Sequence, residues 1–493
     1  MTDEPGKNNR EVGNSHDADE LRSFGYQQQL KRSMGSFSSF AISFSLISII
    51  TGIFANFGFG IQQVGGAIVW SWMLVGVGQF LVALVMADLS IRFPISGYGY
   101  QWTSRLTNPH IGYFVGWLLL LQFLTGFPGV CQALADTIYD FLGGGNNNWT
   151  VTWLTIVVIS IITIIHLYGI RIVSLVNDIG VHAEIVGASF TIVLLFGAAF
   201  WAGNVDFAVL FNRTNLQTGQ AAGFSAFALS LLMGAWCLTG FEAAADLAEE
   251  THQPRRIVPW AVLTSQLSAA IGGLLMLMAF LFSTENLSAI QQSEAPLLMI
   301  LQTKLGNRVT GVIGVVIVLS ILACGVASMA TATRLIYSLA RDNMLPFSSF
   351  LKKVHPVYQA PRKATIAVWA LSCLCVITLR HLELITSISA VAGYLGYGGI
   401  LLATIIAKTG TEQPISGFTL GRWRQPIRLT ALIWTLIVVA ALTIPETQVT
   451  GLQETHLPAK STLFAIVLGI VAYSVSIKRK IDRGAAGPPV QKK

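Results

Sequence analysis

Long apolar segments recur along the entire chain and limit its fold more than any other feature. A membrane-spanning helix needs about 20 consecutive, mostly apolar residues, and the sequence contains twelve such segments. Charged residues make up only 11% of the chain, against about 25% in soluble proteins. We therefore predict an all-α integral membrane protein with twelve transmembrane helices, which lie at about 37–62, 65–92, 110–140, 151–170, 177–202, 223–249, 257–283, 309–340, 364–380, 384–408, 427–446 and 460–477.

The basic residues indicate how the chain is oriented. With both termini in the cytoplasm, 26 of the 31 Lys and Arg residues fall in inside segments and 5 in outside loops. Cytoplasmic loops carry this excess of positive charge. We predict a cytoplasmic N-terminal tail at 1–35, a twelve-span domain at 36–478 and a cytoplasmic C-terminal tail at 479–493, in the plasma (inner) membrane. The net charge of +7 is spread over short loops and tails, so it does not indicate nucleic-acid binding.

Motifs of common enzyme classes are missing from the sequence. It contains no Gly-x-x-x-x-Gly-Lys-Ser/Thr loop, no His-Glu-x-x-His and no Gly-x-Ser-x-Gly. All five cysteines lie in apolar segments, and no pair predicts a disulfide framework or a metal site. We predict no cofactor, no metal and no enzymatic activity. A polytopic membrane enzyme and a non-transporting sensor are the alternatives from other functional classes.

Predicted span 6 carries acidic residues beside a glycine. The segment reads Trp236-Cys-Leu-Thr-Gly-Phe-Glu-Ala-Ala-Ala-Asp246, which places Glu242 and Asp246 at membrane depth after Gly240. Charge at this depth is costly and usually faces a protein interior or a water-filled path. A glycine beside it indicates a helix break that exposes backbone polar groups to a cavity. Transporters build substrate sites from such breaks.

Predicted span 1 has a similar pattern, with small and hydroxyl residues that end in Thr51-Gly52. If the helix unwinds there, N–H groups of the following half-helix form a positive dipole end that suits a carboxylate. The free C=O groups of the preceding half-helix suit an ammonium. Tight packing through small residues is the alternative for this stretch. Because spans 1 and 6 begin the two predicted five-helix halves, their shared pattern favours a break in both.

Three acidic residues are candidates for coupling or gating: Glu184, Glu242 and Asp246. Glu184 lies deep in span 5, where a carboxyl group can bind and release a proton or balance a cation during transport. A structural hydrogen bond to His182 or to a neighbouring span is the alternative.

The acidic residues after the predicted break recur at helical spacing. Glu242, Asp246 and the pair Glu249-Glu250 therefore share one predicted helix face. This face can pair with Arg255 or Arg256, or with Arg334 and Arg341 of span 8, and such pairs would close an inner gate. For Glu249-Glu250, an ordinary solvated helix end is the simpler interpretation.

Several stretches resemble one family. They are Phe24–Arg32, Phe40–Gly52, Phe93–Trp102, Thr239–Thr251 and Arg334–Asp342. Through them the chain resembles the amino acid–polyamine–organocation superfamily, most closely the amino acid/choline transporter branch, whose members carry amino acids, γ-aminobutyrate or choline. The resemblance covers about residues 24–477.

This resemblance implies an inverted 5+5 repeat with broken helices 1 and 6 and two extra helices. Repeat 1 would cover about 37–202, repeat 2 about 223–408 and the extra helices about 427–477. The substrate would rest on the unwound centres of spans 1 and 6. The substrate-binding residues nominated in this way are Ser48, Ile49, Thr51, Gly52, Cys237, Leu238, Thr239, Gly240 and Phe241, to which we add the flanking aromatic residue Trp236. Some relatives have a Lys in span 5 where this chain has Glu184.

The sequence thus predicts a secondary active transporter that works by alternating access. The expected substrate is a small amino acid or a related amine such as γ-aminobutyrate, driven by a proton or another gradient. A choline or polyamine carrier, or an amino acid exchanger of the same fold, is the alternative. The expected partners are the small-molecule substrate, a coupling proton or cation and the lipid bilayer.

Overall fold

The structure is a computed structural model in which almost all of the transmembrane region is described. The described residues are 17–30, 32–144, 148–168, 170–201, 203, 205–355, 360–407, 417–445 and 456–489. The outer parts of both predicted tails, 1–16 and 490–493, lie outside these ranges. Within the described ranges the chain forms helices and two isolated β-bridges but no strand. The predicted all-α class is confirmed.

The helices follow the predicted apolar segments closely, except where two segments are broken. The longer elements are α2 (Ser36–Ile47), α3 (Ile49–Val64), α4 (Ile68–Arg92), α5 (Tyr98–Leu106), α6 (Pro109–Phe141), α7 (Asn148–Leu167), α8 (Ile170–Trp201), α9 (Phe224–Cys237), α11 (Pro254–Phe282), α13 (Pro296–Arg341), α15 (Arg362–Leu379), α16 (Leu382–Ile406), α17 (Arg424–Thr443) and α18 (Leu457–Ala472). Shorter elements are α10 (Ala243–Asp246), η3 (Ala248–Glu250), α12 (Leu287–Gln292), α14 (Ser348–Leu351) and α19 (Lys478–Asp482).

Ten helices of the described ranges are long and apolar enough to cross a membrane. One of them, Ser36–Arg92, joins the segments predicted as spans 1 and 2, and predicted span 6 is represented by the shorter apolar helix Phe224–Cys237. Large apolar side chains such as Val186 and Val193 are exposed on the outside of the bundle, where lipid rather than water suits them. The integral-membrane prediction is confirmed, and the count of twelve spans stays a prediction.

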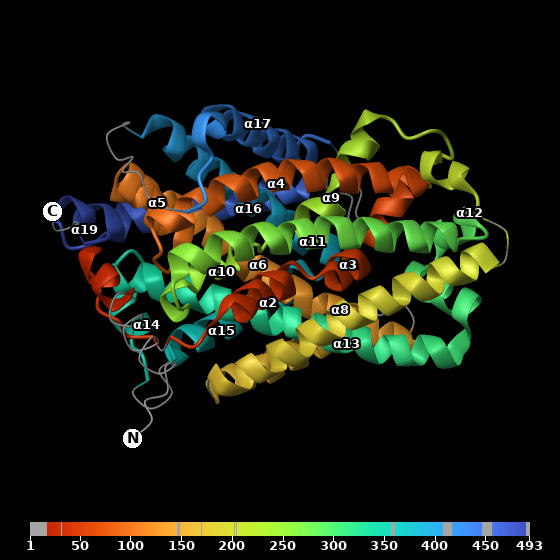
Figure 1. Cartoon of the computed structure of the whole chain (residues 1–493), viewed down its shortest axis with the longest axis horizontal. Helices are drawn as coiled ribbons and strands as arrows, with labels where there is room; N and C mark the ends of the chain where they lie inside the picture. The colour runs from red at the N-terminus through yellow and green to blue at the C-terminus, as the bar shows by residue number, and fades with distance from the viewer. Residues whose placement is uncertain are drawn as a thin grey trace, which may run out of the picture.

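The two broken helices lie in the middle of the bundle. Figure 1 shows α2 and α3 at the centre, with α11 on one side and α8 and α13 on the other. α9 packs along α3, α16 along α6, and α4 along α11. The segment 17–34, α5 and α19 gather at one end of the bundle, which we call the terminal end, and α12 lies at the opposite, far end (Figure 1).

The inner parts of both predicted tails pack against the bundle. The N–H groups of Ser33 and Met34 donate to the Glu250 carbonyl at 2.9 and 3.0 Å. The Gly487 N–H donates to the Asp342 carbonyl at 2.9 Å. A further ion pair joins Arg255 to Glu20. The sequence did not predict this docking, because each contact joins residues far apart in the chain.

A close approach between α8 and α13 brings Glu184 into the centre. A Cβ on Gly180 would lie 2.0 Å from the Ala323 Cβ, and one on Gly187 would lie 2.0 Å from the Val316 Cγ1. Residues three or four apart share one helix face, so Glu184 lies on the face that these glycines turn to α13. The two glycines thus allow α8 to pack closely enough for the Glu184 side chain to reach the break in span 1.

This packing predicts that Gly180→Val lowers stability. The added side chain overpacks the α8–α13 contact and should cost about 1–3 kcal/mol. The matched control is Gly197→Val on the same helix, because a Cβ there meets nothing within 4 Å. Thermal unfolding of the purified protein in detergent should show a clearly lower midpoint for Gly180→Val only. Equal midpoints for the two variants would contradict the close approach.

Candidate functional site

Span 1 is broken at Ser48. α2 ends at Ile47 and α3 begins at Ile49, while Ser48 has φ 34° and ψ 96°, a positive φ that few non-glycine residues adopt. The Ser48 Oγ accepts the Thr51 N–H at 3.2 Å and so caps α3. The sequence placed the break at Thr51-Gly52, and that position is wrong: both residues lie in the first turn of α3. The side-chain cap of Ser48 fixes the break before them.

Gly52 allows two helices to touch. A Cβ on Gly52 would lie 2.1 Å from the Cys237 Sγ and 3.1 Å from the Cys237 Cα. The α3 backbone therefore lies directly against the end of α9, where a larger residue cannot fit. Gly52 thus holds the first break next to the second.

Span 6 is broken where the sequence predicted it. α9 ends at Cys237 and α10 begins at Ala243, and Gly240 between them has φ 104°, which suits glycine. A Cβ on Gly240 would also lie 2.7 Å from the Leu46 Cγ. After the break, α10 makes only one turn before η3 begins. The long helix face expected for the acidic residues is therefore not formed, and these residues point to separate partners.

A small cavity of about 40 Å³ lies at the breaks. Five of the ten predicted binding residues line it: Thr51, Trp236, Cys237, Thr239 and Gly240. The other five, Ser48, Ile49, Gly52, Leu238 and Phe241, are buried in the same two segments. A water molecule needs about 10–15 Å³ of such space, so the cavity has room for a few waters and not for an amino acid. The site is closed in this conformation.

Side chains from four other helical segments complete the cavity wall. They come from α2, α6, α13 and α16 and are Leu46, Ile47, Gln122, Phe123, Gly126, Phe127, Val130, Cys324, Ser328 and Ser389. None of these residues was predicted from the sequence. Gln122 is the one wall residue that the sequence could have indicated, because a polar side chain in the middle of an apolar span usually faces the protein interior. The apolar members are brought to the cavity by helix packing alone.

Glu184 lies at the first break. It is 1% exposed, and its Oε1 accepts the Ile50 N–H of the first turn of α3 at 3.4 Å. This places a carboxylate at the positive end of a helix dipole. His182 does not bind Glu184, because its Nδ1 contacts the Asp178 carbonyl oxygen at 2.7 Å. The other partner considered from the sequence, a neighbouring span, is the one that Glu184 contacts.

Glu242 has the matching position at the second break. Its Oε2 accepts the Gly240 N–H at 3.1 Å, and its Oε1 accepts the Tyr397 hydroxyl at 2.7 Å. The Tyr397 ring stacks on Phe241 with centroids 5.8 Å apart. Each broken helix thus has a buried carboxylate bonded to a backbone N–H. From the sequence Tyr397 is a possible aromatic wall residue that we did not include among the candidates, because one tyrosine in an apolar span does not reveal its partner.

Asp246 and Glu249 hold the loop between α4 and α5. The Asp246 Oδ1 accepts the Gly97 N–H at 2.8 Å, and the Glu249 Oε1 accepts the Ser96 N–H at 3.3 Å. Gly97 has φ 88°, so this loop is fixed in a conformation that favours glycine. Any movement of the segment after the second break would therefore be transmitted to this loop.

Two arginines of α13 hold the segment that follows the second break. Arg341 Nη2 lies 3.1 Å from the Glu249 Oε1, and Arg334 Nε lies 2.9 Å from the Glu250 Oε1. Glu249 and Glu250 are 0% and 2% exposed, so a solvated helix end is wrong for both. Of the ion pairs considered from the sequence, those of Arg334 and Arg341 are formed, whereas Arg255 pairs with Glu20 instead.

Asp342 ties these ion pairs to the N-terminal segment. Its Oδ2 accepts hydrogen bonds of 2.8 Å from the hydroxyls of Tyr26 and Tyr100 and from the Gln101 Nε2. Burial, with the Asp342 carboxylate adding to it, raises the pKa of the Tyr26 phenol, so this hydroxyl stays a donor. We call Glu249, Glu250, Arg334, Arg341 and Asp342 the terminal-end cluster.

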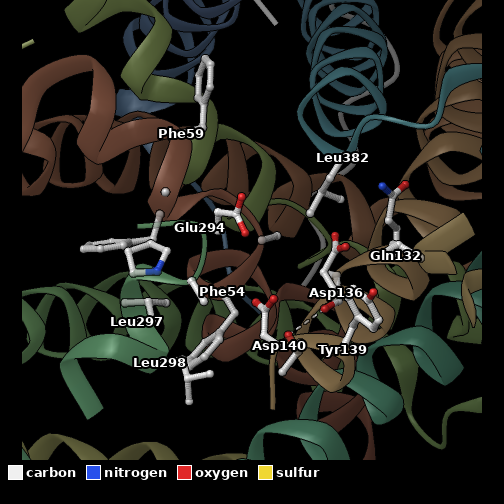
Figure 2. A pocket seen from close by; sticks show the side chains of 18 of the residues that line it. Phe54, Phe59, Gln132, Asp136, Tyr139, Asp140, Glu294, Leu297, Leu298 and Leu382 are labelled. Carbon is white, nitrogen blue, oxygen red and sulfur yellow. Dashed lines mark hydrogen bonds between the residues drawn. The ribbon is translucent and has the colours of Figure 1, made fainter. Parts of the chain in front are cut away.

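A larger cavity of about 340 Å³ lies elsewhere in the bundle, among residues of α3, α6, α13 and α16. Figure 2 shows the carboxylates of Asp136, Asp140 and Glu294 around this space, and Glu383 also lines it. The lining guanidinium of Arg380 lies over the Trp149 ring at 4.1 Å. The cavity is therefore rich in negative charge, which raises the local concentration of cations.

Comparisons with known proteins identify the family of this chain. The model of the amino acid permease family matches residues 34–472. The chain belongs to this family. It is similar to the amino-acid permease BAT1 of Arabidopsis thaliana, with 25% identity over 463 residues that cover 86% of this chain and 88% of the relative. It is also similar to the thiamine transporter thi9 of Schizosaccharomyces pombe, with 25% identity over 519 residues that cover 92% of this chain and 85% of the relative. Membership of this family confirms the predicted superfamily and the prediction of a membrane transporter.

The terminal-end cluster predicts a specific pattern of stability. Glu250→Leu leaves the Arg334 guanidinium buried without its carboxylate and should cost about 3–5 kcal/mol. Glu250→Leu combined with Arg334→Leu removes both charges and should be less destabilised than Glu250→Leu alone. Thermal unfolding in detergent compares the unmodified protein, Glu250→Leu, Arg334→Leu and the double variant. A double variant as unstable as the sum of the two single variants would contradict a buried, coupled pair.

Proposed function

We propose that the chain is a secondary active transporter for a small amino acid or a related amine, working by alternating access. The observation that carries the proposal is the position of the two breaks, which lie against each other at Gly52 and Cys237 beside one cavity. Free peptide groups at such breaks supply both N–H donors and C=O acceptors. A zwitterion needs both kinds of group, one for each of its charged ends.

The ten nominated residues are proposed to form this binding site. The substrate carboxylate would accept N–H groups of the first turn of α3, where a helix N-terminus favours negative charge. The substrate ammonium would face carbonyl oxygens at the ends of α2 and α9, with Glu242 nearby at the second break. Trp236 and Thr239 line the cavity and would contact the rest of the substrate.

The proposed cycle begins from the closed state that the structure describes. The terminal-end cluster seals one side, and opening it would require the Arg334 and Arg341 ion pairs to separate. We place the terminal end and both chain termini in the cytoplasm, in the plasma membrane, on the distribution of Lys and Arg. The repeats at about 37–202 and 223–408 would then move relative to each other, with the extra helices at about 427–477 outside the repeats.

A second candidate substrate is an organic cation such as a polyamine or choline. The supporting observation is the group of four carboxylates around the 340 Å³ cavity. One relative is a transporter of thiamine, whose thiazolium ring carries a positive charge. Such a cation has no carboxylate that could bind the N-terminus of α3. A panel of zwitterionic and cationic substrates therefore separates the two candidates.

The site assignment predicts that Gly52→Leu and Gly240→Leu each abolish transport without preventing membrane insertion. Leucine at either position would meet Cys237 or Leu46 and displace one break from the other. Uptake of labelled amino acids and amines into proteoliposomes, with and without a proton gradient, is the measurement. Gly311→Leu is the control, because nothing lies within 4 Å of a Cβ there.

Two outcomes would count against the proposal in different ways. Absence of uptake, exchange and binding by the unmodified protein across the whole panel would reject the transport function. Normal transport by both leucine variants would reject the site and leave the transport function standing.

The acidic cavity predicts a charge effect on substrate capture. Glu383→Gln should raise KM for cationic substrates by about three- to tenfold at low salt, because it weakens the field that concentrates cations. The effect should shrink at high ionic strength, where charges are screened. Asp206→Asn is the control, since Asp206 is an exposed acid that does not line this cavity. An equal effect of both variants on KM would contradict a role for this cavity.

A further inference from the structure

We propose that Glu184 competes with the substrate carboxylate for the N-terminus of α3, and that it gives way when it takes up a proton. The ionised Glu184 carboxylate would occupy this helix end in the empty carrier. The inference rests on the proposed function and deepens it in two respects. It names a zwitterion with a free carboxylate as the substrate class, and a proton as the coupling ion.

The N–H groups at the start of α3 are already occupied in this structure. The Thr51 N–H donates to the Ser48 Oγ at 3.2 Å, and the Ile50 N–H donates to the Glu184 Oε1 at 3.4 Å. The Gly52 N–H donates to the Ser48 carbonyl at 3.0 Å. A substrate carboxylate therefore cannot reach the Ile50 N–H until the Glu184 carboxylate leaves it.

The Glu184 carboxylate is poorly satisfied where it lies. A distance of 3.4 Å is long for an N–H···O hydrogen bond, and the Oε2 is buried without a hydrogen-bond partner in the described ranges. Burying a charge without full compensation is costly. The Glu184 carboxylate is therefore bound less closely than that of Glu242, whose two oxygens accept hydrogen bonds of 3.1 and 2.7 Å.

The groups that face Glu184 from the neighbouring helices carry no positive charge. Ser48 at the break, Cys237 of α9 and Cys324 of α13 are its polar and titratable neighbours. On α8 itself, His182 is turned to the Asp178 carbonyl oxygen. No ion pair joins Glu184 to a Lys, Arg or His within the described parts of the chain. A change in its own protonation is therefore the direct way to free α3.

The exchange balances charge and protons. A proton from the loading side converts the Glu184 carboxylate to a neutral carboxyl group, which loses its attraction to the helix dipole. The substrate carboxylate then takes the Ile50 N–H, so that the loaded carrier has one negative charge at this end, as the empty carrier with ionised Glu184 does. After the substrate leaves on the other side, Glu184 releases the proton there and binds the N–H again. Each zwitterion crosses with one proton, and one positive charge moves inward.

The test compares a zwitterion with the same molecule lacking its carboxylate. The zwitterionic probe is the L-amino acid, or γ-aminobutyrate, that the unmodified protein takes up fastest from a panel of these compounds. The second probe is the corresponding amine, in which hydrogen replaces the carboxylate. Binding is measured on full-length protein in nanodiscs from pH 5.5 to 9.5. Where Glu184 is ionised, Kd for the zwitterion should fall about tenfold per unit decrease in pH, as expected for one proton bound with each ligand.

Glu184→Gln should remove this pH dependence. Glutamine keeps the size of the side chain but cannot bind the coupling proton, so the zwitterion Kd should change less than about twofold over the range. Counterflow exchange should persist in this variant while the proton gradient stops driving uptake. The amine should show no tenfold-per-unit dependence in either protein. Asp178→Asn, an acid elsewhere on the same helix, is the control and should keep the pH dependence of the unmodified protein.

The outcomes separate this inference from the proposed function. If the unmodified protein neither binds nor transports any panel member, both fall. If it does, and Glu184→Gln shows the same pH dependence, competition by Glu184 is overturned while transport stands. Loss of binding by folded Glu184→Gln at every pH would also overturn it. If Glu184→Gln does not fold, Glu184→Asp replaces it. The shorter acid reaches α3 less well, so the zwitterion should bind more tightly to this variant than to the unmodified protein at pH 8. Unchanged affinity would contradict the inference.

Discussion

Two backbone N–H groups in the middle of the bundle, those of Ile50 and Gly240, are met by buried carboxylates instead of helical carbonyls. Inside a membrane protein an unsatisfied peptide group costs several kcal/mol, so a helix can stop at this depth only where another group replaces the missing bond. Glu184 and Glu242 supply that group. The breaks in spans 1 and 6, and the cavity beside them, depend on this substitution of side chain for backbone.

The packing of the bundle serves to bring these groups together. Gly180 and Gly187 let α8 approach α13 so that Glu184 reaches α3, and Gly52 lets α3 touch Cys237 at the end of α9. The segment after the second break is too short to be held by its own helix. The arginines of the terminal-end cluster hold it instead, and the N-terminal segment packs over the same place through Tyr26.

The sequence predicted the features that depend on local composition. Apolar length predicted the membrane helices, and the Thr239-Gly240 pair beside acidic residues predicted the second break. The first break was placed one turn too late, because Ser48 has no glycine to mark it and its cap forms only in the folded backbone. Contacts between distant segments, such as Tyr397 with Glu242 or Tyr26 with Asp342, leave no periodic signal. The sequence also favoured a solvated helix end for Glu249 and Glu250, because their arginine partners lie more than 80 residues away in the chain.

The reactivity of Cys237, a native thiol that lines the cavity between the breaks, tests most directly whether substrate binds there. A small thiol reagent is applied to the protein in membranes, and modification of each cysteine is followed by peptide mass spectrometry. A saturating transported substrate should slow the modification of Cys237 severalfold and leave the partly exposed Cys373 on α15 unchanged. If Cys237 reacts at the same rate with and without a substrate that the protein transports, the substrate does not bind between the broken helices.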